Sequence, residues 1–474
     1  MMTSRRRLLF CASALGVWAT TAATLAACSD DAAPRPAFEP PNEDSGTRAS
    51  LPETGAVPDA LAPDAPDTKP PFDPKDEPVV CAEEPCAVEL TAGENHFCVR
   101  MSDGTARCWG DDTRGSLGGP SPALDGGVHT VTVDGLTGAA QISAGGTTTC
   151  ARLDDGGVVC WGGNDVGQLG RALDPPSVDD GAHPEIAPVA LPSAATRVDV
   201  GVRSACATLT SGEVWCWGAN SQRLLARDTD AGTGGPAPAD LGALAITRTA
   251  AGTDTAFGIT TTGELVSWGS TAGTNGSVSG RIASLSPDPR PVLIDVDGVT
   301  SFAVSSTTMY QPGGGFPRPP ARGLAHACAV SKAGLLYCWG DSNAGAMGTG
   351  LPDVARLPTL AAVESDKAYP QQVAAGGEIT CVRLTDGSVQ CAGDDGLGAL
   401  GRGKAEKFSM FFVPATAFEG HAVRVATSRG AVCALVQGGS VVCWGSNLLG
   451  ELGQGTTDDE PHPSPVPVAF QKGQ

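Results

Sequence analysis

Six pairs of cysteines recur along the chain, each pair enclosing nine residues, with a period of just over fifty residues between most successive pairs. The pairs are Cys98 and Cys108, Cys150 and Cys160, Cys206 and Cys216, Cys328 and Cys338, Cys381 and Cys391, and Cys433 and Cys443. In five of them the second cysteine is followed directly by Trp-Gly. A fixed period of this length is typical of repeat architectures, in which each unit buries its faces against its neighbours.

Each pair brackets a predicted β-hairpin. In the first pair, Ser102-Asp103-Gly104 stands at the midpoint between two short apolar or β-branched segments. A three-residue loop with Gly104 in the left-handed conformation places Cys98 opposite Cys108, at a pair of residues that exchange no backbone hydrogen bonds. Cα atoms at such a pair lie about 4.5 Å apart, which is within the range that a disulfide tolerates. We therefore predict one disulfide across each hairpin.

Free buried thiols and a metal cluster are the alternatives to these disulfides. Zinc clusters use pairs of ligands two to four residues apart, and a nine-residue spacing across a hairpin does not match that pattern. The chain has 16 cysteines. With Cys11 in a predicted export signal and Cys28 in a predicted lipid site, the remaining number is even, and Cys81 and Cys86 form the predicted seventh pair.

The first residues are typical of an export signal. Residues 1–27 combine a basic start at Arg5–Arg7 with an apolar stretch and small residues before Cys28. Leu25-Ala26-Ala27-Cys28 resembles a bacterial lipobox, which implies cleavage before Cys28 and acylation of its thiol and new amino group. The alternative is an ordinary cleaved signal in which Cys28 is incidental. The arginines resemble a twin-arginine signal without separating the two export routes.

Residues 28–80 predict a disordered tether behind the lipid. From residue 29 to residue 80 the chain holds twelve prolines and twelve acidic residues against four basic ones. Such a composition does not bury enough apolar surface to fold. We expect the mature protein to be held by its lipid at a bacterial cell envelope, in the periplasm or on the cell surface, where disulfides persist. No further segment is long and apolar enough to span a bilayer.

Alignment on the Trp-Gly position gives seven units. The aligned residues are Trp109, Trp161, Trp217, Trp268, Trp339, Ala392 and Trp444. The tails that follow are alike, as in WGDDTRGSLG from Trp109 and WGSNLLGELG from Trp444. These units resemble the regulator of chromosome condensation repeat family over residues 81–474. The resemblance implies an all-β fold, a seven-bladed β-propeller of four-stranded antiparallel blades, with the tryptophan near the blade interface.

The third and fourth units depart from the pattern. Phe257 and Ser267 occupy the two cysteine positions of the fourth unit, so we expect packing alone to hold that hairpin. The tail of the third unit, WGANSQRLLAR from Trp217, lacks the usual glycines. We expect the least regular blades at these two places.

A propeller needs its ring closed. The first unit begins abruptly at residues 87–90, without a preceding segment of the kind found at residues 186–191. The C-terminus supplies such a segment in Pro465-Val-Pro-Val-Ala-Phe470. We predict that this strand, residues 465–470, joins the first blade and closes the ring.

The chain offers no evident catalytic group. His96 and His326 occupy a repeat position that is filled elsewhere by residues such as Thr148, which predicts a structural role. The other four histidines fall in predicted loops without a nucleophile beside them. Paired acidic residues such as Asp394-Asp395 recur at turns, where Asp favours the turn itself. We predict no catalytic residue, no metal and no cofactor.

The net charge of −21 argues against nucleic acid as a partner, although acidity also simply keeps an exported protein soluble. One insertion of about seventeen residues, around 306–322, lengthens the interval before Trp339. Its candidate binding residues are Met309, Tyr310, Phe316, Arg318 and Arg322. Aromatic and apolar groups of this kind anchor interfaces, and a neutral insertion is the alternative.

The function that these features predict is non-enzymatic. We expect a membrane-anchored, extracytoplasmic scaffold that recognises an unidentified protein, peptide or glycan through loops of the propeller. An envelope hydrolase that acts on polysaccharide through loop carboxylates is one alternative. A passive structural lipoprotein is the other.

Overall fold

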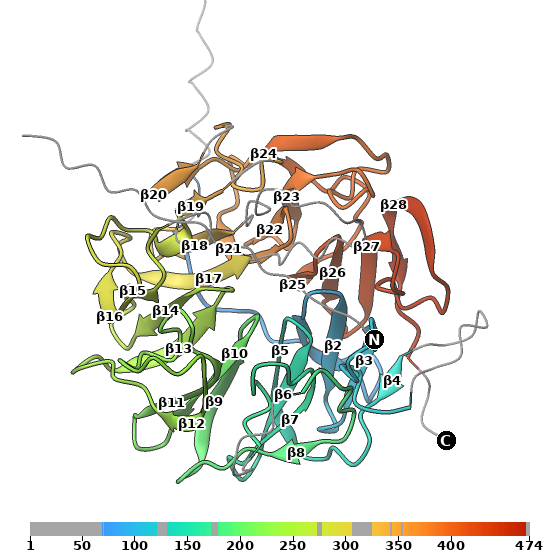
Figure 1. Cartoon of the computed structure of the whole chain (residues 1–474). Coiled ribbons are helices and arrows are strands. Elements are labelled where there is room, and N and C mark those ends of the chain that lie inside the picture. The colour runs from blue at the N-terminus through green and yellow to red at the C-terminus, as the bar shows by residue number, and fades with distance from the viewer. Residues whose placement is uncertain are drawn as a thin grey trace, which may run out of the picture. The chain divides into compact units, whose positions relative to one another are not determined.

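The computed structural model describes residues 69, 71–120, 130–171, 179–272, 277–305, 325–341, 344–351 and 354–470. These residues form seven four-stranded antiparallel sheets arranged in a ring, which Figure 1 shows from near its axis. The predicted seven-bladed β-propeller is therefore confirmed. In the described part of the chain, no helix has the length and apolar character needed to cross a membrane.

Each blade is built from four strands that follow one another in the chain. Blade 1 contains β1 (Ala87–Ala92), β2 (His96–Met101), β3 (Ala106–Gly110) and β4 (Val131–Thr132). Blade 2 contains β5 (Ala139–Gly145), β6 (Thr148–Leu153), β7 (Val158–Gly162) and β8 (Ala187–Pro188). Blade 3 contains β9 (Ala195–Val200), β10 (Ser204–Leu209), β11 (Val214–Ala219) and β12 (Thr233–Pro238). Blade 4 contains β13 (Ile246–Ala251), β14 (Thr255–Thr260), β15 (Leu265–Gly269), the short helix η1 (Ser277–Ser279) and β16 (Asp288–Leu293).

The remaining three blades repeat this plan. Blade 5 contains β17 (Val299–Ser305), β18 (His326–Ser331), β19 (Leu336–Gly340) and β20 (Ala355–Ala361). Blade 6 contains β21 (Pro370–Gly376), β22 (Ile379–Leu384), β23 (Val389–Asp394) and β24 (Phe408–Pro414). Blade 7 contains β25 (Ala422–Thr427), β26 (Ala431–Val436), β27 (Val441–Asn447) and β28 (Asp458–Pro467). The first strand of each blade lies innermost and the fourth outermost (Figure 1).

The hairpins have the register that the cysteine spacing predicts. Gly104 has a φ of 78°, and the Met101 amide donates to the Thr105 carbonyl over 2.9 Å, so that Cys98 faces Cys108 directly. The same register recurs in the other five cysteine hairpins. In these, Cys150 faces Cys160, Cys206 faces Cys216, Cys328 faces Cys338, Cys381 faces Cys391, and Cys433 faces Cys443.

The structure brings the sulfur atoms of all seven predicted pairs to bonding distance, including those of Cys81 and Cys86. In the six hairpins the paired Cα atoms lie 4.0–4.1 Å apart, closer than the expected separation of about 4.5 Å.

Because neighbouring strands run antiparallel, successive connections between strands lie alternately on the two faces of the ring. The turns after the innermost strands and the long loops before the outermost strands lie on one side, which we call the loop face. The β2–β3 type hairpin turns and the connections from blade to blade lie on the other side. Residues 71–86 cross this second side, and we call them the strap and that side the strap face.

The strap contradicts the prediction that the tether is disordered as far as residue 80. Phe72 packs on Tyr369 with 5.5 Å between ring centroids, and Asp76 forms ion pairs with Arg383 at 3.1 Å and with Arg424 at 3.3 Å. The Ala82 amide then donates to the Gly438 carbonyl over 3.0 Å. Composition alone misses this order, because a few ion pairs and one aromatic contact hold a polar segment that has no core of its own.

Tryptophan side chains join the blades. Each blade tryptophan is fully buried and donates its indole N–H to a backbone carbonyl in the loop of the preceding blade. The six donor–acceptor pairs, at 2.6–2.9 Å, are Trp109–Glu451, Trp161–Ser116, Trp217–Gln168, Trp268–Leu224, Trp339–Val278 and Trp444–Ala399. The sequence tails that resemble one another therefore supply the backbone carbonyl that accepts from the tryptophan of the next blade.

Blade 6 carries Ala392 in place of this tryptophan. Phe412 of β24 is buried in the same cluster as Ala392 and Met347 of blade 5. A Cβ atom on Gly348 would collide with the Phe412 ring, where the corresponding glycines of other blades face an indole. Phe412 therefore fills the volume that the missing tryptophan leaves.

The predicted closure by residues 465–470 is wrong as a strand pairing. Residues up to Pro467 belong to β28, which pairs with β27 of blade 7 and makes no ladder with the described strands of blade 1. Blade 1 already has a fourth strand, β4, although it is only two residues long. The last described residues do contact blade 1, because Phe470 meets the edge of Trp109 with 6.0 Å between ring centroids. Closure therefore uses side-chain packing, the strap and hydrogen bonds from Trp109 to Glu451 and from Thr130 to Ala469, without exchange of a strand.

Blades 3 and 4 are as regular in their strands as the others, so the expected irregularity is wrong. In the tail of blade 3, Arg223 and Ala226 stand where blade 7 has Gly450 and Gly453, and both adopt positive φ angles of 61° and 51°. Non-glycine residues seldom adopt this region, so tertiary packing imposes the turn against local preference.

In the blade 4 hairpin Phe257 faces Ser267 without a sulfur bridge, and hydrogen bonds add support to β15 from the neighbouring loop. The Ser267 hydroxyl donates to the Ser279 carbonyl over 2.7 Å and accepts from Arg281 Nε over 3.1 Å. Phe257 opposite it packs on Phe302 of blade 5 with 4.8 Å between ring centroids.

We predict that Trp109→Phe lowers the free energy of unfolding by about 2–4 kcal/mol. The substitution removes buried volume and leaves the Glu451 carbonyl without its indole donor, at the junction of the first and last blades. The midpoint of denaturant unfolding measures the effect.

The matched control is Trp215→Phe. Trp215 is only partly buried, and its indole nitrogen has no hydrogen-bond partner among the described residues. We expect a loss of less than about 1 kcal/mol for this variant, because no interblade hydrogen bond is broken. Equal losses for the two variants would contradict the role of the indole bond.

Candidate functional site

The seven innermost strands enclose a central channel. A cavity of about 240 Å³ lies within it and is lined by residues from β1, β5, β9, β13, β17, β21 and β25. A second cavity of about 100 Å³ lies at the loop-face end, lined by the turns that follow these strands. The channel is the described region to which all seven blades contribute side chains.

One repeat position supplies most of the polar groups of this channel. The residues there, equivalent to the ninth before the first cysteine, are Glu89, Gln141, Arg197, Arg248, Ser301, Gln372 and Arg424. Several bond to the backbone of the next innermost strand. The Gln141 amide accepts from the Val198 N–H over 3.0 Å and donates to the Val198 carbonyl over 2.7 Å. Gln372 makes the same pair of bonds to Val425 at 2.9 Å each.

Three arginines of this position differ in their partners. Arg197 Nε donates to Asp199 over 2.7 Å, and Arg424 pairs with Asp76 of the strap. Arg248 Nη2 donates to the Phe302 carbonyl over 3.2 Å, while its buried Nε has no hydrogen-bond partner among the described residues. Burial, with a smaller contribution from Arg197, lowers the pKa of Arg248 to about 10.

Two half-buried carboxylates lie at the loop-face end of the channel. Burial raises the pKa of both Glu94 and Glu378, and the positive charge of Arg429 opposes the rise in each. The charge of Asp111 raises the pKa of Glu94 further, and that of Asp394 does the same for Glu378. The cavity at this mouth, at about 100 Å³, is well below the roughly 300–1,000 Å³ of typical small-molecule sites. These carboxylates are therefore not placed around a pocket that would hold a sugar ring.

The two repeat-position histidines are structural, as the sequence predicted. His96 and His326 are buried, and their Nε2 atoms lie 2.9 Å from Thr149 Oγ1 and 2.7 Å from Thr380 Oγ1 of the following blades. Burial lowers the pKa of each imidazole to about 4. Of the other histidines, His462 lies within β28, whereas the sequence had predicted a loop.

The acidic pairs serve turns. Asp394 accepts from the Gly396 amide over 3.2 Å, and Asp395 accepts from the Leu400 amide over 2.9 Å and pairs with Arg402 at 2.7 Å. Within the described ranges, no group of three or more His, Cys, Asp or Glu side chains is arranged to hold a metal ion.

The predicted lipid site and the predicted binding loop lie outside the described residues. They comprise Cys28 and the candidates Met309, Tyr310, Phe316, Arg318 and Arg322. The structure places their neighbour Ser305 at the loop-face mouth of the channel. The insertion thus connects β17 to β18, at the position of a short turn in the other blades.

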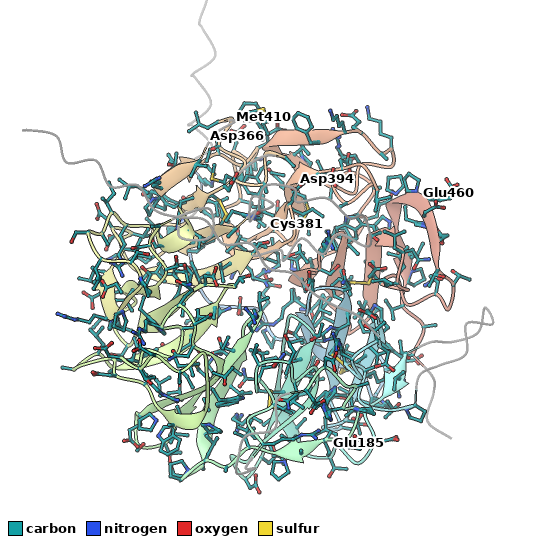
Figure 2. All side chains as sticks on the ribbon, in the orientation of Figure 1. Glu185, Asp366, Cys381, Asp394, Met410 and Glu460 are labelled. Atoms are coloured by element: carbon teal, nitrogen blue, oxygen red, sulfur yellow. A yellow bond between two sulfur atoms is a disulfide. The ribbon has the colours of Figure 1, made fainter. Side chains whose placement is uncertain are left out.

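Apolar side chains gather at the outer rim, where the β19–β20 loop of blade 5 meets β24. The Gly350 amide donates to the Met410 carbonyl over 2.9 Å, and the adjacent Leu351 and Phe411 are 48% and 60% exposed. Figure 2 shows Met410 at this outer edge, far from Cys381 near the centre. We call Leu351, Val354, Phe408 and Phe411 the rim patch; all four are exposed.

Sequence reasoning missed the channel arginines, the strap and the rim patch. A signal for the channel was present, because the polar position recurs at a fixed distance before the cysteines. No comparable signal marks the rim patch. Its residues belong to two blades, which the bridge between Thr349 and Phe411 joins at this edge.

Models of the regulator of chromosome condensation (RCC1) repeat match the chain in three places, at residues 87–116, 139–168 and 333–383. The first two matches cover the three inner strands of blades 1 and 2. The third runs from the hairpin of blade 5 into blade 6. Parts of four of the seven blades therefore match the regulator of chromosome condensation repeat.

Similar proteins match the chain over different lengths. The chain is 25% identical to the ultraviolet-B receptor UVR8 of Arabidopsis thaliana over 386 residues, which are 79% of this chain and 80% of that protein. It is 26% identical to the human X-linked retinitis pigmentosa GTPase regulator over 173 residues, which are 35% of this chain but only 17% of that protein.

Solved structures of the family share the fold. Prp20p of Saccharomyces cerevisiae matches with a TM-score of 0.60 at 18% identity, covering 83% of this chain and 90% of that one. Yeast RCC1 (Prp20) in a structure with Kap60 matches with a TM-score of 0.59 at 16% identity, covering 87% and 91%. At these identities the likeness concerns the fold alone.

We predict that the two buried histidines destabilise the propeller at acidic pH. Their folded pKa of about 4 lies below the ordinary 6.5, so the unfolded chain binds more protons between these values. The full free energy of unfolding is therefore reached above pH 6.5. It falls as the pH drops toward 4, by about 3 kcal/mol for each histidine.

The double variant His96→Thr/His326→Thr tests this, since Thr148 fills the same position in blade 2. Its unfolding free energy should fall less steeply than that of the natural protein between pH 7 and pH 4. The raised carboxyl pKa values of Glu94 and Glu378 act in the opposite direction and are common to both proteins. Equal slopes for both proteins would contradict the assignment.

Proposed function

We propose that the protein is a non-enzymatic binding scaffold, anchored to a membrane outside the cytoplasm, whose propeller recognises another protein. The observation that carries this proposal is the rim patch. Monomeric soluble proteins expose few contiguous apolar surfaces, and those that they expose are often interaction sites. Phe411, the most exposed member at 60%, is of the aromatic type that anchors interfaces.

The surroundings of the rim patch indicate what kind of partner it fits. Charged residues of both signs flank it, among them the exposed Arg356 and Lys407 and the acidic Glu406 and Asp394. An apolar partner surface with a polar edge would complement these features. A nucleic acid would be repelled by the rest of the chain.

The size of the cavities favours binding at the surface over catalysis. Both channel cavities, at about 240 and 100 Å³, are smaller than the roughly 300–1,000 Å³ of sites that enclose small-molecule substrates. The fold neighbours support binding as well. The yeast protein Prp20p has binding properties to Gsp1p and histones, and a second structure holds yeast RCC1 bound to Kap60.

A partner from an envelope extract should bind the intact propeller and the variant Ile282→Ser/Leu285→Ser, and should lose at least about tenfold in affinity for Phe408→Ser/Phe411→Ser. The control pair is also exposed but lies on blade 4. Pull-down followed by titration of the identified partner gives the measurement.

Two other outcomes separate the alternatives. A partner that is lost only on deletion of residues 306–322 would move the binding site to the inserted loop and contradict the rim patch. Failure of every form of the propeller to retain a partner would contradict the scaffold and favour the passive lipoprotein.

The proposed compartment makes a prediction for the mature chain. Its intact mass should correspond to a start at Cys28 with attached acyl chains, and its fourteen remaining thiols should resist alkylation until a reductant is added. Cys28→Ser should leave the protected thiols unchanged while the protein moves from the membrane to the soluble fraction. Free thiols in the unreduced protein would contradict the export that we propose.

A further inference from the structure

We propose that the central channel binds a small oxyanion, of the phosphate or carboxylate class, through Arg248 together with Arg197 and Arg424. All three arginines line the cavity of about 240 Å³. They belong to three different blades, so only the closed ring brings them together.

The charge balance of the cavity supports this site. Its lining holds three arginines and two carboxylates, Glu89 and Asp199. Both carboxylates are already engaged. Glu89 pairs with Arg100 at 3.2 Å, and the two oxygens of Asp199 accept from Arg197 and from the backbone N–H of Thr249. The lining therefore holds one more arginine than carboxylates, within a strongly acidic protein.

Arg248 is the arginine whose charge is least compensated. The described residues contain no ion-pair partner for it, and its buried Nε has no hydrogen-bond partner among them. An enclosed guanidinium without an ion-pair partner is costly, and Arg197 and Arg424 add repulsion that Asp199 and Asp76 partly offset. A bound oxyanion would offset both effects, since the fork of N–H donors matches two oxygens at once.

Neutral donors complete the site. The hydroxyl oxygens of Thr91 and Ser143, which line the same cavity, accept from the amides of Ala144 and Val200 over 3.0 Å each. Each hydroxyl therefore keeps its own hydrogen as a donor. Such donors favour an anion over a cation in the channel.

A carboxylate of the strap already binds one of these arginines. The Asp76 carboxylate forms ion pairs with Arg424 at 3.3 Å and with Arg383 at 3.1 Å. It also acts electrostatically on Arg248. Asp76 is thus an intramolecular carboxylate ligand of Arg424, and a bound anion would compete with Asp76 for this arginine.

The loop-face end of the channel lies opposite the strap, and the blades pack closely there. Gly145, Gly201 and Gly376 lie at the loop-face mouth, where an added Cβ atom would collide with the backbone or the side chain of the next blade. The blades therefore approach most closely there. The cavity volume of about 240 Å³ admits a phosphate or a small carboxylate rather than a peptide.

Calorimetric titration of the whole protein with inorganic phosphate and, separately, with citrate tests the site, at an ionic strength held constant with chloride. We expect saturable binding of one equivalent of at least one anion. Arg248→Gln should weaken it by about tenfold or more, as the loss of a charged hydrogen-bond donor predicts. Asp76→Asn should strengthen it several-fold, because it frees Arg424.

Arg290→Gln is the matched control, because it removes the same charge from an exposed position on β16 outside the channel. It should leave the affinity unchanged. If Arg248→Gln fails to fold, Arg248→Lys keeps the charge without the fork and should still weaken binding. The absence of saturable binding for both anions, or equal effects of Arg248→Gln and Arg290→Gln, would overturn the proposal.

Discussion

The hydrogen bond from a buried indole to a carbonyl of the preceding blade is the interaction on which the ring depends. A four-stranded blade has two faces to bury and cannot bury either alone. The indole of Trp161 packs on the loop of blade 1 and donates to the Ser116 carbonyl, which fixes both the distance and the rotation between the two blades. Six blade junctions repeat this contact. At the seventh, the Phe412 ring supplies the volume without the hydrogen bond.

A ring made of such junctions still has to join its last blade to its first. Trp109 donates to the Glu451 carbonyl across that junction, and Phe470 and the strap add contacts from both ends of the described chain. In the anchored arrangement that we propose, the tether reaches the propeller on the strap face. The loop face then lies on the side of the ring opposite to the entry of the chain.

The charges of the protein are divided between outside and inside. Acidic residues dominate the chain as a whole, whereas arginines line the channel and Arg356 and Lys407 flank the rim patch. Net charge alone would suggest that such a protein avoids anions. The local excess of guanidinium groups in the channel favours an anion there, because charges interact more strongly where water is partly excluded.

The sequence by itself determined the number of blades, the hairpin register and the structural role of His96 and His326. Each of these follows from local spacing, because a hairpin turn sets which residues face each other, and repetition sets the count. Only the tertiary structure decided the closure of the ring, the order of the strap, the positive φ of Arg223 and the meeting of Arg197, Arg248 and Arg424. Those features join residues that are distant in the chain, and the energy of such contacts depends on how the blades pack rather than on any local pattern.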